Sequence, residues 1–161
     1  MKRAYLLPSR TLQPGELCIA CQPVVLRTIL GSCVGVTFWS ERLGAGAMCH
    51  GVLPKCPGGL EFAATAEGHR FVDFSIRYLV RRFEAMGACR QELAVKVFGG
   101  ADVLPVARVG PTVGALNCQS ALEVLQEEGL QIQARDLGGV RGRRIHFHTG
   151  TGEVLVYRIQ P

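Results

Sequence analysis

The most constraining feature of this sequence is an irregular alternation of short strand-like segments with two helix-like ones. Residues 24–39 and 45–53 are rich in β-branched and small side chains, a composition typical of strands. Gly31-Ser32 and the polar residues 40–44 interrupt them and favour turns. The sequence therefore predicts strands joined by tight turns in this region.

Two later segments predict helices. Between residues 67 and 86 the apolar side chains follow helical spacing before a glycine stop; they are Val72, Ile76, Leu79, Phe83 and Met86. Residues 101–116 contain several Pro and Gly and predict a loop. Asn117 can cap a second helix that ends before Gly129, with Cys118, Ala121, Leu122 and Leu125 on its apolar face.

Four further segments predict strands: AVKVF at 94–98, LQIQARD at 130–136, RRIHFHT at 143–149 and EVLVYRI at 153–159. A Gly-Thr-Gly turn separates the last two, which suggests a hairpin. Because helices alternate irregularly with hairpins, we expect a mixed α/β (α+β) fold. Its sheets should be partly antiparallel and packed with helices, rather than a doubly wound parallel sheet.

The length favours one domain over residues 1–161, with about residues 1–21 as an N-terminal extension or first strand. The 48% hydrophobic content is enough for a packed core. Only a few apolar residues lie between the initial basic pair and Pro8, too few for a signal peptide. Charged residues, Gly or Pro interrupt every candidate membrane span. We therefore expect a soluble, cytoplasmic protein without membrane insertion.

The seven cysteines cannot all pair within the chain, because their number is odd. Most should be free thiols in a reducing compartment. Cys18 and Cys21 form a C-x-x-C that could bind zinc together with Cys49 or Cys56, or act in redox exchange. A second close pair is missing, so we expect no metal. His146 and His148 alternate on a predicted strand, and we assign them no catalytic role.

The net charge of +5 favours an acidic partner. Nucleic acid is one such partner, although aromatic residues make up only 7% of the chain and no nucleic-acid-binding motif is found. An acidic protein surface is the other candidate, and composition alone does not separate the two. The basic run RGRR contains Arg141, Arg143 and Arg144, which could dock such a surface or simply form a solvated turn.

Cys33 in LGSCVGV and His50 in AMCHGVLP, seventeen positions later, are candidates for a catalytic pair. A free thiol needs a base or a positive environment to become nucleophilic at neutral pH, and a histidine could provide it. Gly31 and Ser32 would allow a sharp turn with free backbone N–H groups for an oxyanion hole. The alternative is a core thiol and a core histidine on ordinary strands.

Five motifs in order resemble those of the CheD family, the chemoreceptor glutamine deamidases. They are LGSCVGV, AMCHGVLP, FGGAD, VGALN and DLGGVRGRRIHFHTGTGEVLV, and the resemblance covers about residues 22–159. In that family the cysteine is the nucleophile, the histidine is its base and an upstream threonine completes a triad. The resemblance places these roles on Cys33, His50 and Thr28, although Arg27 holds the position where some members have the threonine.

The resemblance implies hydrolysis of glutamine side chains in the cytoplasmic helical region of methyl-accepting chemotaxis receptors, giving glutamate and ammonia. Hydrolysis of glutamyl methyl esters is a related activity. No metal, organic cofactor or nucleic-acid partner is expected. Family members also bind a CheC-type phosphatase of the response regulator, so the alternative function is a non-catalytic regulatory binding partner of such a phosphatase.

Overall fold

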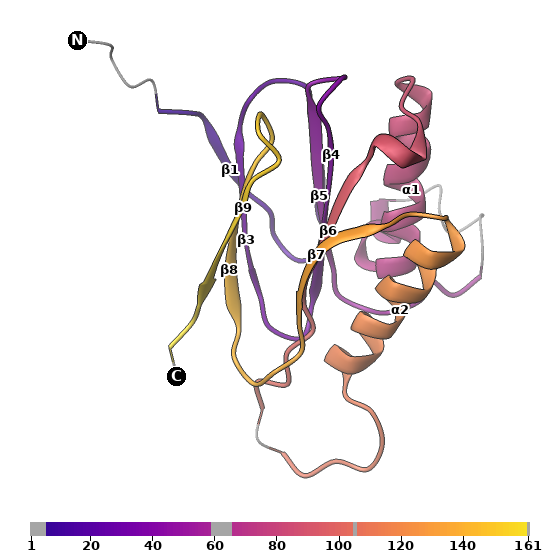
Figure 1. The fold of residues 1–161 in the computed structure, drawn as a ribbon. Helices are drawn as coiled ribbons and strands as arrows, with labels where there is room; N and C mark the ends of the chain where they lie inside the picture. Colours follow the sequence, from indigo (N-terminus) through magenta and orange to yellow (C-terminus); the bar gives the residue numbers. More distant parts are fainter. Residues whose placement is uncertain (1–5, 59–65, 105, 161) are drawn as a thin grey trace.

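The computed structural model describes residues 6–58, 66–104 and 106–160, and these form three layers. Figure 1 shows a four-stranded sheet, a five-stranded sheet and a layer with the two α-helices, in that order. The helices therefore cover only the five-stranded sheet. The mixed α+β fold expected from the sequence is confirmed.

The four-stranded sheet has the order β1-β3-β8-β9. Its strands are β1 (Ser9–Thr11), β3 (Val25–Leu30), β8 (Arg143–His148) and β9 (Val154–Arg158). Strand β1 pairs with β3 in parallel, and the other neighbours are antiparallel. The predicted hairpin of the last two strands is confirmed, and β1 lies within residues 1–21, where the sequence predicts an N-terminal extension or first strand.

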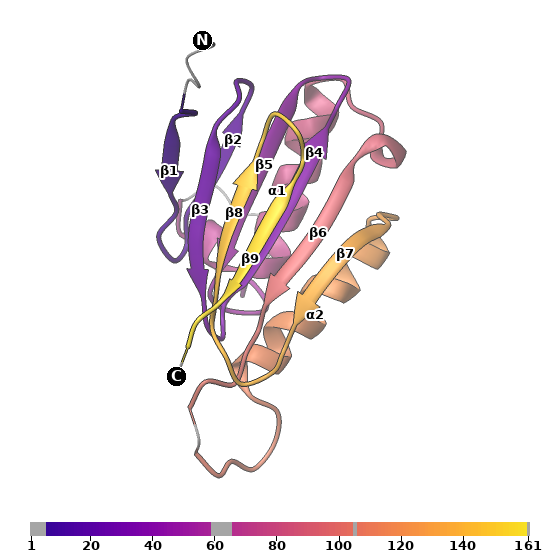
Figure 2. The same cartoon turned by 60° about the vertical axis from the view of Figure 1, so that its left-hand side comes forward.

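The five-stranded sheet has the order β2-β5-β4-β6-β7. Its strands are β2 (Leu17–Ala20), β4 (Val34–Ser40), β5 (Ala45–Gly51), β6 (Ala94–Gly99) and β7 (Ile132–Leu137). Only β6 and β7 run parallel, and helix α2 connects them as the crossover that such a pair requires. In Figure 2 this sheet extends from β2 to β7 in front of the helices.

Helix α1 spans Val72–Ala85 and helix α2 spans Val113–Glu127, with short 3-10 turns at Ala66–Arg70 and Arg90–Glu92. Two predicted boundaries are wrong. The segment before Phe71 is a separate 3-10 turn, and the Thr112 side chain caps α2 by accepting a hydrogen bond of 3.1 Å from the Ala115 N–H. Asn117 lies inside the helix, so its side chain does not cap the N-terminus of α2.

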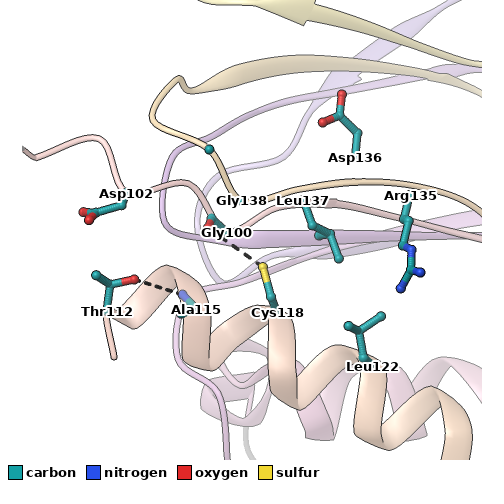
Figure 3. A pocket seen from close by; sticks show the side chains of 11 residues that line it. Gly100, Asp102, Thr112, Ala115, Cys118, Leu122, Arg135, Asp136, Leu137 and Gly138 are labelled. Carbon is teal, nitrogen blue, oxygen red and sulfur yellow. Dashed lines mark hydrogen bonds between the residues drawn. The ribbon is translucent and has the colours of Figure 1, made fainter. Parts of the chain in front are cut away.

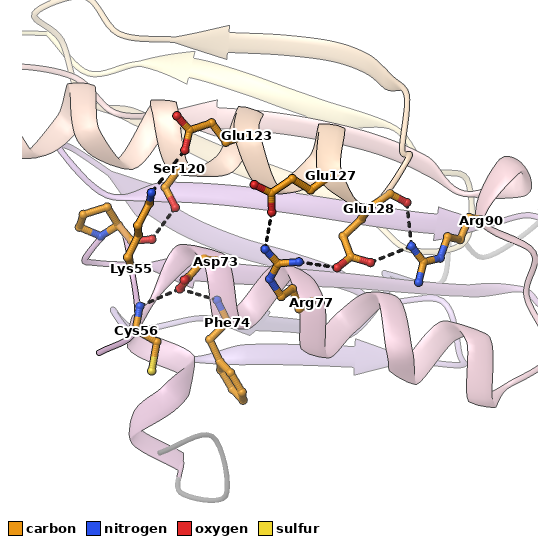
Figure 4. Close-up of polar contacts among 11 residues, drawn as sticks. Lys55, Cys56, Asp73, Phe74, Arg77, Arg90, Ser120, Glu123, Glu127 and Glu128 are labelled. Atoms are coloured by element: carbon orange, nitrogen blue, oxygen red, sulfur yellow. Dashed lines mark hydrogen bonds and ion pairs between the residues drawn. The ribbon is translucent and has the colours of Figure 1, made fainter. Parts of the chain in front are cut away.

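Ion pairs join the two helices on their exposed side. Arg77 bridges Glu127 at 2.5 Å and Glu128 at 2.7 Å, and Arg90 contacts Glu128 at 2.7 Å (Figure 4).

None of the described helices is long and apolar enough to cross a membrane.

Two apolar cores lie on either side of the five-stranded sheet, because successive strand side chains point to opposite faces. The larger core packs this sheet against α1 and α2 and includes Val36, Phe38, Ile76, Leu79 and Phe83. The smaller core lies between the two sheets and consists of Leu12, Leu26, Leu30, Met48, Phe98, Ile145 and Phe147. The candidate site lies at one end of this smaller core.

Candidate functional site

Cys33 lies in the turn that leads from β3 in one sheet to β4 in the other. Its side chain is half-buried and packs against the core between the sheets. Gly35, two residues later, pairs with His50 on β5, so extending this register places Cys33 diagonal to His50 on the same face of the sheet. The two residues singled out by the sequence are thus brought to one end of the sandwich.

His50 and Thr28 face each other across the space between the two sheets. Both are buried, with 2% and 1% of their surface exposed. The Thr28 Oγ1 lies 2.7 Å from the His50 Nδ1 and donates a hydrogen bond of 2.9 Å to the Leu12 carbonyl. Thr28 at this position, rather than Arg27, contacts the histidine.

These contacts define the tautomer of His50. A carbonyl oxygen can only accept, so the single Thr28 hydroxyl proton goes to Leu12, and the hydroxyl oxygen then accepts from the His50 Nδ1–H. In the neutral ring the free electron pair is therefore on Nε2. This Nε2 is buried and has no hydrogen-bond partner among the described residues. A basic nitrogen is thus left available at the end of the core where Cys33 lies.

Burial keeps both groups neutral at rest. Desolvation lowers the pKa of His50 to about 4, against a small opposing effect of the Glu16 charge. Burial also raises the pKa of the Cys33 thiol, and its own backbone N–H only partly offsets this. The site therefore holds a thiol and a neutral imidazole at neutral pH, instead of a thiolate–imidazolium pair.

Three successive carbonyl groups hold the Cys33 turn. The Gly31 carbonyl accepts from the Ala101 N–H at 2.8 Å, and the Cys33 carbonyl accepts from the Gly100 N–H at 2.8 Å. The Ser32 carbonyl accepts from the Asn117 Nδ2 at 2.9 Å. Within the described ranges no hydrogen bond joins the N–H group of Ser32 or of Cys33 to the backbone of another residue. Free donors beside a thiol have the chemistry that an oxyanion hole requires.

Asn117 connects the two parts of the site. It is fully buried on α2, and its Nδ2 also donates to the Val52 carbonyl at 3.0 Å, two residues after His50. One side-chain amide therefore holds both the turn with Cys33 and the end of the strand with His50. Its Oδ1 is buried and unpartnered among the described residues.

Gly99 and Gly100 form the other support of the turn. Both have positive φ, and a Cβ on Gly99 would collide with the Cys33 carbonyl oxygen. The FGGAD and VGALN motifs were recognised in the sequence, but their supporting role was not predicted. This supporting role depends on contacts between residues that are far apart in the sequence. Asn117, for example, contacts Val52 and Ser32, which are 65 and 85 positions away, and no local pattern shows such contacts.

Two pockets lie near these supports. One of about 300 Å³ adjoins the Cys33 turn at Ser32 and has an apolar lining that includes Leu53, Val103 and Val113. A larger one of about 740 Å³ lies between α2 and the ends of β6 and β7, around Cys118 and Arg135 (Figure 3). None of Thr28, Cys33 and His50 lines the larger pocket.

The structure does not assemble the alternative zinc site. Cys18 packs on the core between the sheets, whereas Cys49 is buried in the core on the helix side. No group of three or more His, Cys, Asp or Glu residues within the described ranges could hold a metal ion.

Arg143 cannot contribute to a docking surface, so this part of the arginine hypothesis is wrong. Its side chain is completely buried, donates to the backbone carbonyls of Asp136 and Gly138, and pairs with the Asp136 carboxylate at 2.8 Å. Because it lies on β8 and Asp136 on β7, it joins the two sheets. Arg141 and Arg144 are exposed.

Comparison with known proteins places this geometry in context. Residues 53–158 match the family described as CheD chemotactic sensory transduction. A Geobacter sulfurreducens protein named probable chemoreceptor glutamine deamidase CheD 2 is 42% identical over 153 residues, 95% of this chain and 91% of its own. A Rhodospirillum rubrum protein named probable chemoreceptor glutamine deamidase CheD is 39% identical over 154 residues, 96% of this chain and 84% of its own. The Pseudomonas savastanoi pv. phaseolicola protein of that name is 37% identical over 153 residues, which cover 93% of this chain and 84% of its own.

Proposed function

Because this chain belongs to the CheD family, we propose that it is a protein-glutamine deamidase that acts on chemoreceptors. Two relatives are named probable chemoreceptor glutamine deamidases, and the matches cover 91% and 84% of their own length. The observation that carries the proposal is the arrangement of His50, with Nδ1 bound to Thr28 and Nε2 free at the end of the core that contacts Cys33.

In the first step, the neutral His50 Nε2 takes the Cys33 thiol proton as the sulfur attacks the amide carbon of a substrate glutamine. A carbon–sulfur bond forms and the carbonyl electrons move to oxygen. The N–H groups of Ser32 and Cys33 would stabilise this oxyanion. Since the resting pKa of His50 is low and that of Cys33 high, the proton moves only together with the attack.

When the tetrahedral intermediate collapses, the His50 imidazolium gives its proton to the leaving nitrogen and ammonia departs. A thioester remains on Cys33. Neutral His50 then takes a proton from water as its oxygen attacks the thioester carbon. The carbon–sulfur bond breaks, glutamate leaves, and the His50 imidazolium returns the proton to the Cys33 sulfur. Thr28 keeps Nδ1 protonated throughout. No step requires a metal or an organic cofactor.

The proposed substrates are glutamines in the cytoplasmic helical region of methyl-accepting receptors, with glutamyl methyl esters as related substrates, since both are acyl groups open to the same attack. A reducing compartment such as the cytoplasm fits the seven cysteines, all of which are free thiols.

The test is deamidation of a purified receptor cytoplasmic fragment, followed as ammonia release and as conversion of glutamine to glutamate by mass spectrometry. Wild type should be active, and Cys33→Ala and His50→Ala should both be inactive while remaining folded. Cys89→Ala is the control, because this exposed cysteine lies just before the Arg90–Glu92 turn and belongs to none of the segments that support Cys33. If folded wild type is inactive on several receptor fragments but binds a CheC-type phosphatase, the regulatory alternative replaces the enzyme.

A further inference from the structure

Among the residues that the structure describes, no other layer covers the outer face of the four-stranded sheet (Figure 1). Six side chains occupy its centre in two cross-strand rows. Arg27, His146 and Leu155 are paired across β3, β8 and β9, and Ile29, Arg144 and Tyr157 form the next row. We call these six residues the outer patch.

The outer patch combines exposed apolar and basic groups. Ile29 is 56% exposed and Tyr157 is 46% exposed, although each lies one residue before the end of a regular strand, β3 and β9 respectively. The rings of Tyr157 and His146 are in contact, with centroids 5.1 Å apart. Thr28 and Ile145 lie between patch residues on β3 and β8, so their side chains point to the inner face of the sheet, and both are buried. Apolar side chains left on an open sheet face often mark an interaction surface.

No acidic side chain of the described residues forms an ion pair with the arginines of the outer patch. Arg77 and Arg90 on the helix side each contact a glutamate (Figure 4), whereas Arg27 and Arg144 take part in no ion pair among the described residues. After burial, the nearby charges of Arg27, Arg144 and His148 also lower the pKa of His146, and no acidic group opposes them. A partner with carboxylates would therefore be attracted to this face.

The outer patch lies on the strand that leads to the Cys33 turn. Arg27 and Ile29 flank Thr28, whose side chain points inward to His50. Ile29 is four residues before Cys33 on the same strand and turn. A protein bound along this face would thus lie beside the end of the sandwich where the thiol is located.

We propose that the outer patch docks an acidic helical surface of the substrate chemoreceptor, carboxylates against Arg27 and Arg144 and an apolar side chain against Ile29 and Tyr157. This inference rests on the proposed function and adds where the receptor binds. A second copy of this chain is a poor occupant, because the net charge of +5 would oppose contact between two basic faces.

The test compares Arg27→Glu/Arg144→Glu with the control Arg81→Glu/Arg135→Glu, which changes the net charge equally at exposed arginines on α1 and β7. Affinity for a receptor cytoplasmic fragment is measured at low and high salt, together with kcat and KM for deamidation. The patch variant should lose at least about tenfold in affinity at low salt, with a higher KM, an unchanged kcat and a weaker salt dependence. The control should match wild type.

A second variant, Ile29→Asn, tests the apolar contact without a change of charge and should weaken binding at both salt concentrations. Wild-type affinity in both patch variants would overturn the proposal, and so would binding of an oligonucleotide in preference to the receptor fragment. Receptor binding that depends on the patch, without any deamidation, would instead refute only the proposed function.

Discussion

Acidification offers a quantitative test of the buried, neutral His50. Its pKa of about 4 lies below the ordinary value of 6.5, so the unfolded chain binds this proton more readily than the folded one. Stability is therefore fully present above about pH 6.5 and is lost as the pH falls toward 4. At about 1.4 kcal/mol for each pH unit, the loss attributable to His50 is about 3 kcal/mol near pH 4.

The measurement is urea unfolding of wild type and His50→Asn between about pH 7.5 and pH 4. Asparagine can retain a hydrogen bond to Thr28 but does not titrate. The difference in unfolding free energy between the two proteins should change by about 3 kcal/mol over this range, because all other groups are shared. A parallel NMR titration gives the pKa directly. A constant difference, or a measured pKa of His50 at or above its ordinary value, would refute the assignment of a neutral ring.

Three further predictions concern the groups around His50. Thr28→Val should lower kcat roughly 100-fold, as loss of an oriented base does, while Thr28→Ser restores most of it; equal activity of the two would exclude the tautomer argument. Asn117→Ala should cost about 1–3 kcal/mol for each carbonyl left unsatisfied and lower kcat with little change in KM, and a stability loss at unchanged kcat would contradict its supporting role. Alkylation of Cys33, mapped by mass spectrometry, should be slow at neutral pH and accelerate as the pH rises; a rate that stays constant into the acidic range would indicate a thiolate–imidazolium pair.

Local patterns in the sequence predicted most strands, because strand composition is a local property. For Cys33 and His50 they left open a catalytic pair or two core side chains, and only the resemblance to the CheD motifs favoured the pair. Local patterns failed where the partner is distant. Asn117 resembles a helix cap when only its neighbours are considered, yet its amide serves carbonyls 65 and 85 positions away. Arg143 resembles a solvated residue in a basic run, but inside the protein its guanidinium donates to the carbonyls of Asp136 and Gly138 and to the Asp136 carboxylate.

Strand β3 carries residues of both the candidate site and the outer patch, because successive side chains of a strand point to opposite faces of the sheet. Thr28 points into the sandwich and binds the base, while Arg27 and Ile29 on either side point outward to the patch. A substrate bound on the outer face would therefore contact the same strand that holds His50 in its reactive tautomer and leads into the Cys33 turn. Substitutions of the patch should change KM and leave kcat, and those of Thr28 should do the reverse, because neighbouring residues of one strand serve opposite faces.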